Sequence, residues 1–186
     1  MTNAPNEGAR RLHVCPLDHL DATLTSSASS HLISVMGPAD MIARRSEFAP
    51  GRHLQIAVND IAEPREGYIL AEASHIREVT QFVLSWRDDD TADGDLCLHC
   101  WAGVSRSTAA ALIALCALNL DVDEAEIAQA LYSAAPFINP NPRLIDLGDN
   151  VLGRKGRLVR AVRSLPQPEM VSLGRPFSLP AFWGRN

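Results

Sequence analysis

The stretch from His99 to Thr108, His-Cys-Trp-Ala-Gly-Val-Ser-Arg-Ser-Thr, places a thiol and a guanidinium on either side of five small or apolar residues. An apolar run ends at Cys100, and a long apolar helical pattern follows Arg106. The N-terminus of a helix presents unpaired N–H groups and partial positive charge, which favour a thiolate and attract anions. An arginine at Arg106 can hold two oxygens of one phosphate. The pattern therefore favours an anion cradle that presents a phosphate to a thiolate.

The cradle is expected to be built from backbone N–H groups that curl around the anion. Gly103 permits the tight turn that such a loop requires. Ser107 can donate a hydrogen bond to the Cys100 sulfur, and we expect His99 to orient the loop through its ring N–H rather than to act as a base. The expected substrate-binding residues are Trp101, Ala102, Gly103, Val104, Ser105 and Arg106.

Attack of a thiolate on a phosphoester creates an alkoxide or phenolate, which needs a proton from a second loop. Asp60 follows the apolar run 54–58 and is the leading candidate for this acid, with Glu63 in reserve. The same carboxylate could then activate water against a phosphocysteine, so the hydrolysis would need no metal and no cofactor. A structural alternative makes Asp60 a helix N-cap and Glu63 its capping-box partner, and the N-cap role is compatible with the acid role.

The elements that must position these residues alternate along the chain. Strand-like runs cover residues 11–17, 31–36, 54–58 and 96–99, and helical patterns cover 69–84, 107–120, 121–133 and 143–152. Residues 21–31 suit either a weak helix or a loop. This alternation predicts an α/β fold with a central, largely parallel sheet flanked by helices. Ligands bind at the carboxyl ends of strands in such sheets, and both Asp60 and the Cys100 loop follow strand ends.

The segment HCWAGVSRST resembles the His-Cys-x-x-Gly-x-x-Arg-Ser/Thr signature of cysteine-dependent protein tyrosine phosphatases, and is most similar to the dual-specificity branch. The segments 58–60 (Val-Asn-Asp) and 138–141 (Ile-Asn-Pro-Asn) resemble further parts of that family. The resemblance implies a phosphatase-like fold in which Cys100 is the nucleophile, Arg106 the phosphate clamp and Asp60 the general acid. Two departures are the long interval between Asp60 and Cys100 and the large Trp101 beside the nucleophile.

The resemblance covers residues 11–152, which we expect to form a phosphatase domain. We expect residues 1–10 to form a polar leader and residues 153–186 to form a basic C-terminal extension. From residue 151 onward the chain carries seven Arg or Lys and a single acid, Glu169. Pro and Gly predict an extended segment after Arg163. We expect this segment to dock on the acidic body of its own molecule or of another, in preference to nucleic acid or a membrane.

The amino-acid composition limits the partners that we expect this chain to bind and the state of its cysteines. A net charge of -5 over 186 residues argues against a dedicated nucleic-acid binder. The chain shows neither a secretory signal core nor an apolar run long enough to span a membrane, so a cytoplasmic protein is expected. Because the cytoplasm is reducing, we expect its four cysteines to be free thiols, with Cys97 and Cys116 in the core. Cys97 and Cys100 lie three residues apart on a strand, roughly 10 Å and too far for a disulfide.

Several functions fit the loop. The first is hydrolysis of phosphotyrosine through a phosphocysteine intermediate, with phosphoserine and phosphothreonine as further candidates. The alternatives are a non-protein phosphoester (inositol phosphate, nucleotide or RNA 5′ end), a sulfur-transferring rhodanese, and a non-catalytic phosphate-binding module. No lysine lies between Cys100 and Arg106, which favours a phosphoprotein over an inositol lipid.

Overall fold

A computed structural model describes residues 10–91 and 93–183, so most of the expected leader lies outside the described residues. Five strands form one sheet in the order β3-β2-β4-β1-β5. The first four strands run parallel, and β5 pairs antiparallel with β1. The strands are β1 (Arg11–Pro16), β2 (His31–Met36), β3 (His53–Ala57), β4 (Leu96–Cys100) and β5 (Phe177–Pro180). The prediction of an α/β fold with a largely parallel sheet is confirmed.

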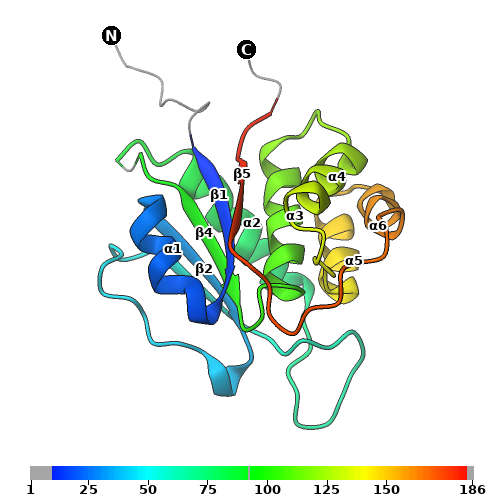
Figure 1. Cartoon of the computed structure of the whole chain (residues 1–186), viewed down its shortest axis with the longest axis horizontal. Coiled ribbons are helices and arrows are strands. Elements are labelled where there is room, and N and C mark those ends of the chain that lie inside the picture. The colour runs from blue at the N-terminus through cyan, green and yellow to red at the C-terminus, as the bar shows by residue number, and fades with distance from the viewer. Residues whose placement is uncertain (1–9, 92, 184–186) are drawn as a thin grey trace.

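Helices cover both faces of this sheet (Figure 1). Helix α1 packs on one face over a small apolar cluster around Cys15, Leu20, Leu32 and Cys97. The other helices lie on the opposite face, where every residue of α3 is buried. The helices are α1 (Leu20–Ser27), α2 (Ala73–Arg87), α3 (Arg106–Leu118), α4 (Glu124–Ala134), α5 (Pro142–Val151) and α6 (Arg157–Arg163), with short 3-10 turns at Leu17–His19 and Pro38–Asp40.

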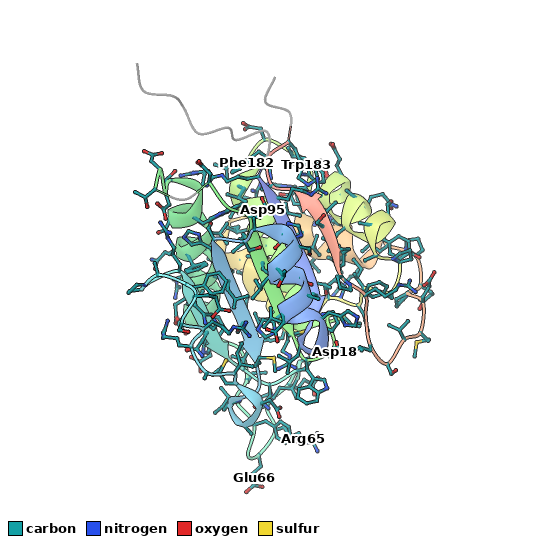
Figure 2. All side chains as sticks on the ribbon, turned by 60° about the vertical axis from the view of Figure 1, so that its left-hand side comes forward. Asp18, Arg65, Glu66, Asp95, Phe182 and Trp183 are labelled. Atoms are coloured by element: carbon teal, nitrogen blue, oxygen red, sulfur yellow. The ribbon has the colours of Figure 1, made fainter. Side chains whose placement is uncertain are left out.

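Burial explains why the central strands β2 and β4 are mostly apolar. All residues of β2 and β4 are buried, as expected for parallel strands covered by helices on both faces. The carboxyl ends of the parallel strands share one edge of the sheet. Asp18 follows β1 at that end, whereas Asp95, which precedes β4, lies at the opposite end beside Phe182 and Trp183 (Figure 2). The Cys100 loop therefore begins at the ligand-binding edge that this class of sheet offers.

The segment expected as a C-terminal extension contributes to the core. Residues 157–163 form α6, whose Leu158 and Ala161 are buried, and β5 adds a strand beside β1. Without β5, β1 would present an unpaired edge of backbone groups. Arg10, at the end of the expected leader, is also buried, with its guanidinium over the rings of Trp86 and Phe182. The core therefore extends beyond the expected limits of residues 11 and 152.

A buried ion cluster ties α4 to the segment around α6. Glu124, whose side chain is 3% exposed, lies 3.0 Å from Arg154 Nη1 and 3.0 Å from Arg157 Nε. Burial raises the pKa of Glu124, but the hydrogen bonds from Arg157 and the charge of Arg154 outweigh it and leave the pKa lowered. The position of Glu124 in the first turn of α4 also places a negative charge at the positive end of the helix.

Replacing Glu124 by glutamine should lower the free energy of unfolding by about 3 kcal/mol, because Arg154 then stays buried without its counter-ion. Urea denaturation near neutral pH measures this. The matched control is Glu169→Gln: Glu169 is 57% exposed and lies 3.6 Å from Arg175, so the change should be below about 0.5 kcal/mol. Because the pKa of Glu124 is lowered by folding, the difference between native and Glu124→Gln should shrink as the pH falls below about 4. Equal losses in both variants would contradict the ion cluster.

Candidate active site

Cys100 is the last residue of β4, and its thiol is buried at the base of the loop that leads into α3. The backbone N–H of Gly103 donates to Cys100 Sγ at 3.3 Å, and the Ser107 hydroxyl lies 3.1 Å from the same sulfur. Donors directed at sulfur stabilise a thiolate more than a thiol. The expected partnership between Ser107 and Cys100 is therefore present in the structure.

The carbonyl oxygens of the loop point away from its centre. Those of residues 101, 102, 104 and 105 accept hydrogen bonds from the N–H groups of Leu17 (3.1 Å), Gly174 (2.8 Å), Asn139 (3.0 Å) and Asn141 (3.3 Å), respectively. Within residues 10–91 and 93–183, the N–H groups of residues 102 and 104–106 donate no hydrogen bond to another residue. A ring of free N–H groups with outward carbonyls is the backbone arrangement that binds an anion.

Gly103 makes the tight turn of this loop possible. Its φ of +68° lies in the left-handed region, and a Cβ at this position would stand 2.6 Å from the backbone nitrogen of Pro16. Gly103 does not itself line the pocket above the loop, whereas the other five expected substrate-binding residues do. It therefore shapes the cradle from below, where the loop crosses the end of β1.

Arg106 is the first residue of α3, and its guanidinium is anchored by a backbone carbonyl from outside the loop. Its Nη1 donates to the carbonyl oxygen of Val58 at 3.0 Å. Its Nε is buried, has no hydrogen-bond partner among the residues described, and lies 3.8 Å from Asp60 Oδ2. A buried guanidinium with a free donor at the edge of a pocket is suited to hold an anion.

Asp60 lies across the pocket from the loop and is bonded to it. Its Oδ1 accepts from the Ser105 hydroxyl and from Asn141 Nδ2, both at 2.7 Å, and its side chain is 39% exposed. The structure therefore brings Cys100, Arg106 and Asp60 together, as expected. Asn141 was not among the expected site residues, although it belongs to the Ile-Asn-Pro-Asn segment.

The N-cap interpretation of Asp60 is wrong, because no helix begins there. The chain from Val58 to Glu72 is irregular, and α2 begins at Ala73, where Glu72 and His75 form the capping box. Glu63 is exposed in this irregular segment, caps no helix, and does not line the pocket. Of the two candidate acids, the structure places only Asp60 beside the cradle.

A pocket of about 450 Å³ opens above the cradle. Besides Asp60, Cys100 and the loop, it is lined by Asp40 from the turn after β2 and by Val171 and Ser172 from the segment between α6 and β5. Sequence patterns gave no signal for these three residues. The arrangement offers a thiol, a guanidinium, free N–H groups and a carboxylate to one tetrahedral anion.

Comparison with known proteins identifies the fold. No protein-family model matches the chain, and no curated protein matches it in sequence. Among solved structures, DUSP15 has a TM-score of 0.61 at 19% identity, covering 89% of this chain and 93% of its own. Human DUSP28 has a TM-score of 0.56 at 18% identity, covering 77% of this chain and 89% of its own. PTPMT1 in complex with PI(5)P has a TM-score of 0.55 at 14% identity, covering 80% of this chain and 90% of its own. The chain has the fold of the dual-specificity phosphatases.

The other cysteines of this dual-specificity phosphatase fold do not line the pocket above the cradle. Cys15, Cys97 and Cys116 are buried free thiols, and Cys97 Sγ lies 4.0 Å from Cys15 Sγ rather than near Cys100. Among the described residues, no group of three His, Cys, Asp or Glu could hold a metal ion. No helix in that part of the chain is long and apolar enough to cross a membrane.

Hydrogen bonds behind the cradle fix the tautomer of His99. The backbone N–H of Arg45 donates to His53 Nδ1 at 3.2 Å, so His53 carries its proton on Nε2 and donates to Ser34 Oγ at 2.8 Å. Ser34 then donates to His99 Nε2 at 2.6 Å, which leaves the His99 proton on Nδ1. Burial lowers the pKa of both imidazoles to about 4, and the backbone of Cys100 partly opposes this at His99. Both rings are therefore neutral at neutral pH.

These tautomers can be measured by long-range ¹H–¹⁵N NMR correlation of the histidine rings. We expect His99 protonated on Nδ1 and His53 on Nε2 at neutral pH, with neither ring gaining a second proton above about pH 5. We call the chain of hydrogen bonds from Arg45 N–H through His53 and Ser34 to His99 the relay. Ser34→Ala should break the relay and broaden or shift the His99 signals. Ser29→Ala should leave them unchanged, because Ser29 is a half-buried serine after α1 outside the relay. A His99 protonated on Nε2 in the native protein would refute the relay.

Proposed function

We propose that this protein is a cysteine-dependent phosphatase that hydrolyses phosphotyrosine in proteins, with phosphoserine and phosphothreonine as further substrates. The observation that supports it best is the convergence of Cys100, Arg106 and Asp60 on one pocket. The free N–H groups of the loop and the buried Nε of Arg106 give this pocket the donors that a phosphate requires.

In the first step, the thiolate of Cys100 attacks phosphorus, a sulfur–phosphorus bond forms, and the phosphorus–oxygen bond to the substrate breaks. The leaving oxygen takes a proton from Asp60, which must be protonated at this point. Arg106 and the loop N–H groups hold the non-bridging oxygens, on which negative charge is concentrated. The arrangement of donors around the pocket suits this in-line transfer.

In the second step, Asp60, now a carboxylate, takes a proton from a water that attacks the phosphocysteine. The sulfur–phosphorus bond breaks, inorganic phosphate leaves, and the electron pair returns to Cys100 as a thiolate. The Ser107 hydroxyl, 3.1 Å from that sulfur, stabilises the departing anion. Ser105 and Asn141 hold Asp60 through Oδ1, which leaves Oδ2 to exchange the proton in both steps.

Charge at the pocket supports a singly phosphorylated protein as the substrate. Asp40 lines the pocket beside Asp60, and Arg106 is the one cation among the residues that line it. A second phosphate, as on an inositol polyphosphate, would meet carboxylates rather than lysines. PTPMT1 binds PI(5)P on the same fold, so a lipid substrate is the alternative to test directly. A pure binding module needs no proton donor, whereas Asp60 places a carboxylate in the same pocket as the Cys100 thiol.

The first test is hydrolysis of p-nitrophenyl phosphate in EDTA. We expect the native protein to be active, Cys100→Ser to be inactive, and Asp60→Asn to lose roughly 10²–10⁴-fold in kcat through loss of the acid. Glu63→Gln is the matched control and should retain native activity, because Glu63 lies outside the pocket.

Activity that persists in Cys100→Ser would contradict the thiolate mechanism. A native protein that binds vanadate but hydrolyses nothing would favour the binding module, and transfer of sulfur from thiosulfate to cyanide would favour the rhodanese. The substrate class is decided by comparing kcat/KM for a phosphotyrosine peptide, PI(5)P in vesicles, a nucleotide and a 5′-phosphorylated RNA. The proposal requires the peptide to be the best of these.

A further inference from the structure

A second pocket lies directly beside the phosphate pocket. It has a volume of about 280 Å³ and is lined by Leu17, Asp18, Trp101 and Leu173. Trp101 lines both pockets. The side chains of Trp101 and Leu173 are large and apolar, yet these residues are 55% and 38% exposed. Exposed apolar groups gathered around a hollow indicate a binding surface.

The walls of this second pocket are fixed to the cradle by its own hydrogen bonds. Leu17 N–H donates to the carbonyl oxygen of Trp101, and Gly174 N–H donates to that of Ala102. A Cβ on Gly174 would stand 2.6 Å from Cε2 of Phe137 and 3.0 Å from the Gly103 carbonyl oxygen, so a larger residue here would have to displace these neighbours. The pocket is thus held in place next to the cradle rather than formed by a loose loop.

The C-terminal segment contributes consecutive residues to the two pockets. Val171 and Ser172 line the phosphate pocket, and Leu173 lines the second one. Neighbouring residues of an extended peptide are spaced by about 3.4 Å. Because Trp101 also lines both pockets, a residue that flanks the phosphorylated one in an extended peptide could place its side chain in the second pocket.

We propose that the second pocket binds a large apolar side chain, such as leucine, methionine or phenylalanine, that flanks the phosphorylated residue of a protein substrate. This inference rests on the proposed function and specifies its substrate. Three apolar side chains form most of the wall, and such a cavity suits one apolar side chain. An anionic phospholipid fits poorly, because Asp18 lines this pocket and Asp40 the adjacent one.

The experiment uses phosphotyrosine peptides in which each flanking residue is varied in turn. At one flanking position, leucine, methionine and phenylalanine should give kcat/KM roughly ten-fold above alanine, as expected for burying one such side chain. Leu173→Ala should remove most of this preference by slowing the apolar peptides while sparing the alanine peptide. Met170→Ala is the matched control: Met170 is 94% exposed in the same segment and lines neither pocket, so the preference and the hydrolysis of p-nitrophenyl phosphate should be unchanged.

Binding of the same peptides to Cys100→Ser separates this inference from the proposed function. If the native protein hydrolyses p-nitrophenyl phosphate but shows no apolar preference, the second pocket is refuted and the phosphatase stands. If no substrate is hydrolysed but the peptides bind with the apolar preference, the pocket stands and the phosphatase is refuted. Preference for PI(5)P vesicles that is lost in Leu173→Ala would assign the pocket to an acyl chain and overturn the inference.

Discussion

The direction of a few peptide groups governs the architecture of the site. An anion above Cys100 can be bound only if the loop between β4 and α3 turns its N–H groups inward, and this requires its carbonyl oxygens to be satisfied elsewhere. They are satisfied by three segments: the turn that follows β1, residues 139–141 at the start of α5, and the segment before β5. These segments span most of the described chain. The whole fold is therefore needed to hold one short loop in an arrangement that a free peptide would not keep.

The same constraint explains why the C-terminal segment belongs to the core. Pairing of β5 with β1 fixes the position of Gly174, whose N–H holds Ala102, and the guanidinium of Arg175 lies over Phe137 at 5.3 Å. Residues 171–173, just before this anchor, then form walls of both pockets. A segment that closes the edge of the sheet thus also shapes the surface that a substrate would meet.

Much of the site could be predicted from the sequence because its chemistry is local. Cys100, Arg106 and Ser107 lie within one strand–loop–helix unit, and Asp60 follows a strand that had to end at the same edge. The helical pattern 69–84 starts too early, because α2 begins at Ala73 and Ile69 is held by Asn59. The Ile69 carbonyl accepts from the Asn59 backbone N–H, and the Ile69 N–H donates to the side-chain oxygen Oδ1 of Asn59. That pairing closes an irregular loop, which no helical periodicity reveals.

Other parts of the site could not be found from the sequence, because tertiary packing creates them. Ser34 and His53 act on His99 across two neighbouring strands, and the orientation of the relay depends on one backbone N–H, that of Arg45. Asp40 and Ser172 come from loops without a recognisable pattern. Each of these residues is ordinary in its local sequence, and only its position against the cradle makes it relevant.

The basic residues of the C-terminal segment predicted that it docks on the acidic body of its own molecule or of another. Arg154 and Arg157 pair with the buried Glu124 of α4 in the same molecule, and Arg175 pairs with Glu169 within the segment. Three of the seven positive charges are thus used within the molecule, at separate points of α6 and its flanks. The two pockets next to the segment are lined by carboxylates: Asp40 and Asp60 in one and Asp18 in the other. Around the two pockets, Asp18, Asp40 and Asp60 supply negative charge outside the cradle, whereas Arg106 and the loop N–H groups supply positive charge within it. This distribution of charge favours a single anion in the cradle and opposes further negative charge beside it.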